Sequence, residues 1–183
     1  MGGWRCVITV IAAFVDHDGR SAIASDTGYS TEVLQEVVAG KIVRVGAALV
    51  GLSGTALWAR FLRGAEPVHE PSDVELLADA WIAWAKARGH GSVENRDFLI
   101  NGRFVVLLRG RIYSVGPDGD VIEHERYTAA GAGCDVAMGV LYALSHRHPE
   151  TPAEVAVTLA VEAAMAHAHG CFGRVVLYPG EGP

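Results

Sequence analysis

The amino-acid sequence predicts a single α+β domain in which two antiparallel sheets lie between two pairs of helices, a four-layer αββα sandwich. Three observations support this prediction. Apolar strands are joined by tight turns, which favours antiparallel pairing. Two helical stretches follow the first four strands, and two more follow the next group of strands. The length of 183 residues suits one domain and is enough to bury a core.

The first four strands are expected as two hairpins. Residues 6–15 and 20–26 form the first hairpin, and residues 41–45 and 47–53 form the second, which turns at Gly46. A helix is then expected over residues 54–63, because its apolar positions repeat on one face. This half of the chain therefore provides strands for both sheets and the first outer helix.

The second helix is predicted to start at Ser72, where Glu75 completes a capping box, and to end before Gly89. Another capping box, from Thr151 to Glu154, starts a long alanine-rich helix that ends near His167. The remaining elements are expected in this order: strands over 97–101, 103–109 and 111–115, a hairpin tip at 117–120, a strand over 127–132, a helix over 135–146 and a strand over 174–178.

Composition excludes several classes of function. The formal net charge is −6 and the basic residues are scattered, so no stripe indicates nucleic acid or an anionic membrane. No apolar run reaches transmembrane length. The three cysteines show no metal-binding spacing, and we expect a reduced, cytoplasmic protein without metal or cofactor. Half of the residues are hydrophobic and the mean hydropathy is +0.24, which indicates additional buried surface at subunit contacts.

Three polar residues stand out in the apolar strands. Thr9 lies in the first strand, Asp26 ends the second, and Lys41 begins the third. With the runs Gly51–Ala56, Arg109–Tyr113 and Gly131–Gly139, this order resembles the proteasome β-subunit and HslV-type peptidase family, and most closely its short bacterial and phage members. The resemblance covers nearly the whole chain and implies an N-terminal-nucleophile hydrolase fold.

The resemblance implies a role for each matching residue. Thr9 is the nucleophile, and its free α-amino group is the base. Lys41 lowers the cost of forming the alkoxide, and Asp26 pairs with Lys41. The backbone N–H of Gly54 stabilises the oxyanion. Two further positions, Leu52 and Ala56, match residues that shape the substrate pocket.

The sequence departs from the family at the points that decide activity. Residues 1–8 precede Thr9, and a peptide-bonded nitrogen is no base, so they are expected to be a propeptide or an N-terminal extension. Ile8 stands where the family has glycine. Ala132 and Ala168 replace a serine and an aspartate that hydrogen-bond around the family's amino terminus. An inactive, self-assembling subunit is therefore an alternative, and an amidohydrolase that uses Cys6 is a lesser one.

The resemblance also implies partners. A peptidase of this family assembles as a homo-oligomeric ring or double ring, which encloses its active sites. An ATP-dependent unfoldase delivers its substrate, a peptide or an unfolded protein. The sequence does not indicate the size of the ring or the natural substrate.

Overall fold

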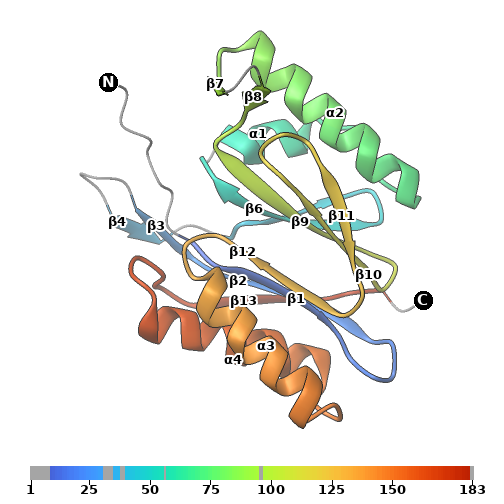
Figure 1. The fold of residues 1–183 in the computed structure, drawn as a ribbon, viewed down its shortest axis with the longest axis vertical. Helices are drawn as coiled ribbons and strands as arrows, with labels where there is room; N and C mark the ends of the chain where they lie inside the picture. The colour runs from blue at the N-terminus through green and yellow to red at the C-terminus, as the bar shows by residue number, and fades with distance from the viewer. Residues whose placement is uncertain (1–8, 31–34, 38–39, 56, 95–96, 182–183) are drawn as a thin grey trace.

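Two sheets form the inner layers of the molecule, and a pair of helices covers the outer face of each sheet (Figure 1). The computed structural model describes residues 9–30, 35–37, 40–55, 57–94 and 97–181. The expected α+β architecture with two antiparallel sheets is confirmed. Among the described residues, no helix is long and apolar enough to cross a membrane.

The first sheet has four strands and carries α3 and α4 on its outer face (Figure 1). Its strands, in spatial order, are β12 (Tyr127–Ala130), β1 (Ile11–Val15), β2 (Ser21–Asp26) and β13 (Val175–Pro179). The two helices are α3 (Cys134–Arg147) and α4 (Ala153–His167). All of these strands pair antiparallel, and β1 and β2 are joined by a tight turn, as expected.

The second sheet has five strands and packs against α1 and α2 (Figure 1). Its spatial order is β11 (Val121–His124), β10 (Arg111–Val115), β9 (Gly102–Leu108), β6 (Ala48–Gly54) and β5 (Ile42–Val45). The helices are α1 (Leu57–Arg63) and α2 (Pro71–Ala87). Two small two-stranded sheets are also present, and the sequence did not predict them as separate sheets. One pairs β3 (Gly28–Ser30) with β4 (Gln35–Val37), and the other pairs β7 (Ser92–Glu94) with β8 (Asp97–Leu99).

Side chains of β1 alternate between the two layers that it separates. Ile11 and Ala13 are buried between the sheets, whereas Ala12 and Phe14 pack against α3 and α4. Successive side chains of a strand point to opposite faces, so Thr9, two residues before Ile11, continues the series that faces the second sheet. The strand period thus positions the threonine hydroxyl between the sheets.

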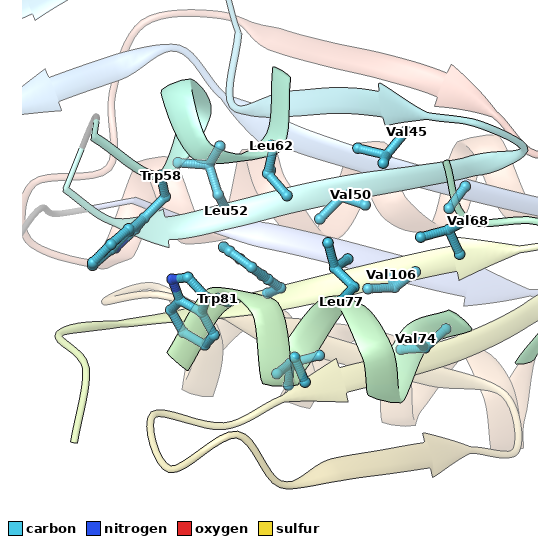
Figure 2. Close-up of a cluster of buried hydrophobic side chains, with 14 of the residues drawn as sticks. Val45, Val50, Leu52, Trp58, Leu62, Val68, Val74, Leu77, Trp81 and Val106 are labelled. Carbon is cyan, nitrogen blue, oxygen red and sulfur yellow. The ribbon is translucent and has the colours of Figure 1, made fainter. Parts of the chain in front are cut away.

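The outer core of the second sheet is rich in aromatic residues (Figure 2). Trp58 and Trp81 meet edge to face with ring centroids 5.6 Å apart, and Trp81 stacks on Phe104 at 4.2 Å. Leu52 points from β6 into this core beside Trp58 and Leu62 (Figure 2). Trp81 of α2 is therefore buried in this core, and Trp84 of the same helix packs against it half-buried.

Both predicted capping boxes are wrong in detail. Helix α2 begins at Pro71, one residue before Ser72, and the carboxylate of Asp73 accepts hydrogen bonds from the backbone N–H groups of His69 and Glu70. These bonds lower the pKa of the Asp73 carboxyl. Helix α4 begins at Ala153 with no side-chain cap from its own segment. Its first N–H instead donates to Asp16, which lies 137 residues away in the chain.

Candidate active site

The three polar residues that the sequence marked converge at one end of the inter-sheet layer. Thr9 lies two residues before the start of β1, Asp26 ends β2, and Lys41 directly precedes β5 in the other sheet. Lys41 Nζ donates to Thr9 Oγ1 at 2.5 Å and to Asp26 Oδ1 at 2.7 Å. Thr9 Oγ1 donates to the same oxygen of Asp26 at 2.7 Å. Hydroxyl, ammonium and carboxylate therefore form a closed three-way network that joins the two sheets.

Backbone groups also hold the Asp26 carboxylate. Oδ1 accepts a hydrogen bond from the N–H of Val10 at 3.0 Å, and Oδ2 accepts one from the N–H of Phe172 at 3.3 Å. Asp26 and Thr9 have no exposed surface, and Lys41 is 4% exposed. A buried carboxylate is tolerated only when it is paired and hydrogen-bonded, and both conditions are met here.

Burial sets the electrostatics of the lysine. Removal from water lowers the pKa of the Lys41 amine below its usual value, and the neighbouring Asp26 carboxylate opposes this shift. An ammonium beside Thr9 Oγ1 favours the deprotonated hydroxyl, because it places a positive charge 2.5 Å from the oxygen that would become negative. The arrangement is therefore suited to activating a hydroxyl nucleophile.

A glycine-rich turn between β12 and α3 fits closely around the backbone of Thr9. Gly133 N–H donates to the carbonyl oxygen of Thr9 at 3.2 Å. Gly131 has a φ of +96°, and a Cβ at this position would collide with the same carbonyl. Only glycine permits this approach, so the turn fixes the position of the threonine main chain.

A cavity of about 560 Å³ lies beside this turn. Gly54, Gly131 and Ala132 are among its lining residues. Gly54, the expected oxyanion donor, thus lines the same cavity as the turn that contacts Thr9. Ala132 presents only a methyl group where the family resemblance implies a hydroxyl.

Leu52 and Ala168 lie away from the cavity beside Thr9. Leu52 does not line the cavity, because strand alternation turns its side chain to the aromatic core on the outer face of β6. Ala168 forms the C-cap of α4 and packs half-buried in the core beneath the first sheet. Ala56 and Cys6 lie outside the described residues, as does the whole 1–8 segment.

Cys171 is a neighbour of the site that the sequence analysis did not identify. Its buried sulfur packs against Gly133, and the next residue, Phe172, holds the carboxylate of Asp26. Burial raises the pKa of the Cys171 thiol to about 11, and the Asp26 carboxylate adds to this shift. Cys171 follows Asp26 by 145 residues, and no local pattern in the sequence indicates that the two are close.

A possible ligand set for a metal ion lies elsewhere. Among the described residues, ligand atoms of Asp16, His17 and Asp18 come within 4.8 Å of one another in the turn between β1 and β2. This turn is at the opposite end of β1 from Thr9. Asp16 already accepts hydrogen bonds from Arg20 and Ala153, which explains its burial without a metal.

Comparisons with solved structures support this architecture. Thiobacillus denitrificans BPH matches with a TM-score of 0.79 and 26% sequence identity over 94% of this chain and 97% of that chain. The same protein in complex with epoxomicin matches with a TM-score of 0.76 over 93% of this chain and 98% of that chain.

A eukaryotic HslV from Trypanosoma brucei shares the fold, with a TM-score of 0.71 and 16% identity over 94% of this chain and 99% of that chain. No protein-family model and no curated protein sequence matches the chain. Since the fold agrees along nearly the full length of both proteins, the chain has the fold of the proteasome β-subunit and HslV-like proteins.

Proposed function

We propose that this chain is the subunit of a self-compartmentalising threonine peptidase, which cleaves peptide bonds through an acyl-enzyme on Thr9 after losing residues 1–8. The hydrogen-bonded network of Thr9, Lys41 and Asp26 is the observation that supports this proposal most directly. The buried Lys41 ammonium donates to the Thr9 hydroxyl at 2.5 Å. A threonine with a purely structural role in a strand does not need a charged partner of this kind.

Removal of residues 1–8 supplies what the network lacks. It converts the nitrogen of Thr9 from an amide into an amine, which accepts the hydroxyl proton while Oγ1 attacks the substrate carbonyl carbon. The amine then passes this proton to the departing amine of the substrate, and water hydrolyses the resulting ester on Thr9. Thr9 has no exposed surface, so hydrolysis also requires Oγ1 to become accessible to the substrate.

Lys41 and Gly54 stabilise the charges that develop during this reaction. The Lys41 ammonium lies against the oxygen that becomes the alkoxide. The backbone N–H of Gly54 is assigned to the substrate oxyanion, and loss of one such donor typically costs about 3 kcal/mol of barrier. Asp26 keeps the lysine charged and in place through the shared oxygen Oδ1.

The subunit is further proposed to form a homo-oligomeric ring in the cytoplasm, supplied with unfolded protein by an ATP-dependent unfoldase. Sequence hydropathy and the family resemblance support assembly. Several large apolar side chains are exposed on the subunit, with Leu76, Ile122 and Tyr142 each more than half exposed. Electron microscopy and light scattering of the purified protein test assembly without reference to activity.

A non-catalytic subunit is the second candidate. It is favoured by Ala132, which offers no hydrogen bond beside Thr9, and by Ala168, which replaces an expected carboxylate. In this function the Asp26–Lys41 pair remains as a structural link between the sheets. A cysteine amidohydrolase that begins at Cys6 remains a lesser candidate.

Intact-mass spectrometry of the purified assembly distinguishes the three candidates. Loss of residues 1–8 with cleavage of fluorogenic peptides supports the threonine peptidase, whereas loss of residues 1–5 supports the cysteine enzyme. A full-length mass without peptidase activity supports the non-catalytic subunit.

Variants at Thr9 test the nucleophile itself. A Thr9→Ala variant should lose activity by about 10³-fold or more, and Thr9→Ser should retain part of it because serine keeps the hydroxyl. Epoxomicin, the ligand in the Thiobacillus denitrificans BPH complex, is a useful probe. It should inhibit the processed protein and not Thr9→Ala. A Thr9→Ala protein that retains wild-type activity would eliminate the threonine mechanism.

A further inference from the structure

Arg103 is an exposed arginine on the wall of the cavity beside the candidate site. It stands near the start of β9, where its carbonyl accepts a hydrogen bond from Ser53 of β6. Within the described part of the chain, no carboxylate lies within ion-pair distance of its guanidinium group. By contrast, Arg44, Arg109 and Arg111 all have such partners on the surface. The charge of Arg103 is therefore available to a ligand in the cavity.

Arg103 lines the same cavity as Gly131 and Cys134, which belong to the turn that contacts Thr9. Side chains alternate along β9, so Arg103 lies on the same face as Val105, which is buried between the two sheets. Cys134 directly follows Gly133, whose N–H donates to the carbonyl of Thr9. Arg103 thus lies across the cavity from the turn that fixes the nucleophile.

The remaining wall of the cavity gives room for a substrate side chain. Gly54, Gly102 and Gly131 present only backbone atoms to the cavity. Glu94 is the only other charged side chain among the cavity-lining residues that the structure describes. The Asp135 carboxylate lies against the Cys134 thiol, so a ligand carboxylate is expected at the Arg103 guanidinium and not at Cys134.

We propose that Arg103 makes this peptidase prefer substrates that carry a carboxylate side chain, aspartate or glutamate, next to the bond that is cleaved. The inference rests on the proposed function, since it assumes that the peptide occupies the cavity beside Thr9. The guanidinium donates two hydrogen bonds to the substrate carboxylate, in a geometry that neither an amide nor an amine reproduces. Arg103 is accordingly a specificity-determining residue, and it takes no part in proton transfer.

The test compares internally quenched peptides that differ at one position on either side of the cleaved bond, with glutamate, glutamine or lysine there. Wild-type protein should cleave the glutamate peptide about three- to tenfold faster in kcat/KM than the glutamine peptide at one of the two positions. Arg103→Gln should abolish this ratio, and Arg103→Glu should reverse it in favour of lysine. Arg60→Gln, which changes an exposed arginine on α1, is the matched control and should keep the ratio.

Two results would overturn the proposal. One is equal cleavage of the glutamate and glutamine peptides at both positions, and the other is an unchanged preference in Arg103→Gln. If the wild type cleaves no peptide, the peptidase function fails, and binding then decides the role of Arg103. Fluorescence anisotropy with the same peptides should show tighter binding of the glutamate peptide to wild type and no difference in Arg103→Gln. Equal affinities for wild type would reject the role of Arg103.

Discussion

The two halves of the sandwich are built from different side chains. The layer between the first sheet and its helices is packed with small residues, among them Ala12, Ala24, Ala156 and Ala160. The layer between the second sheet and its helices contains Trp58, Trp81, Phe61 and Phe104. Large aromatic side chains bury more area each, whereas small residues let backbones approach closely.

The candidate site lies where close backbone approach matters most. Gly131 and Gly133 touch the main chain of Thr9, and Phe172 N–H reaches the carboxylate of Asp26. These contacts need neighbouring segments within hydrogen-bond distance, which the alanine-rich half provides. The aromatic half contributes Lys41 through β5 but keeps its large side chains on the far face of its sheet. We infer that one half stabilises the domain and the other positions the chemistry.

The largest effect is expected from Lys41→Ala, which should reduce both stability and activity. The variant leaves the Asp26 carboxylate buried without its charged partner, and breaking such a pair typically costs about 3–5 kcal/mol. A double variant, Lys41→Met with Asp26→Asn, removes both charges and should regain part of that stability without regaining activity. Denaturant unfolding and peptide hydrolysis measure the two effects separately. Full activity in Lys41→Ala would contradict the role of the lysine.

Trp81→Ala should lower stability by a similar amount but spare the chemistry. Trp81 is fully buried against Trp58 and Phe104, and truncation of a buried tryptophan typically costs about 3–5 kcal/mol. Because none of these residues contacts Thr9, peptide hydrolysis per folded molecule should stay near that of wild type. Trp84→Ala, at a half-buried position on the same helix, should cost less. A selective loss of turnover in Trp81→Ala would show that the two halves are not separable.

The sequence carried enough information for the strand order and for the meeting of Thr9, Asp26 and Lys41. Alternating apolar strands and short turns predict both hairpins. The family resemblance identifies Asp26 and Lys41 as the partners of Thr9. It did not reveal Cys171, because contact with Asp26 depends on how the turn after α4 returns to β2. Leu52 does not reach the pocket that the family resemblance implies, because the strand period turns its side chain toward the aromatic core.

Asp16→Ala should have an intermediate effect on stability. The Asp16 carboxylate is buried and accepts hydrogen bonds from the backbone N–H groups of Asp18, Arg20 and Ala153. Its loss leaves the first N–H of α4 without a partner, which typically costs about 1–3 kcal/mol. Asp18→Ala, an exposed neighbour in the same turn, is the control and should change stability little. Equal effects of the two variants would show that the link to α4 is not stabilising.

The smallest predicted effect is on the pH dependence of the free energy of unfolding, to which Cys171 and Lys41 contribute with opposite signs. The folded state keeps the Cys171 proton up to a pKa of about 11, whereas the unfolded chain releases it near 9.0. The contribution of this thiol to the stability of the folded protein therefore falls as the pH rises from 9.0 to about 11. The lowered pKa of Lys41 acts in the opposite direction, because the unfolded chain then holds the extra proton below pH 10.5.

Comparison of wild type with Cys171→Ala isolates the contribution of the thiol. The alanine variant should be less stable at pH 8, since it loses packing against Gly133, and the difference should narrow as the pH approaches 11. Urea unfolding at several pH values measures this difference directly. Lys41 is present in both proteins, so its own contribution enters the comparison only through its charge interaction with Cys171. A difference in unfolding free energy that stays constant or widens with pH would contradict this prediction. It would mean that the thiol ionises as readily in the folded protein as in the unfolded chain, and that Cys171 is not held in close contact with the site.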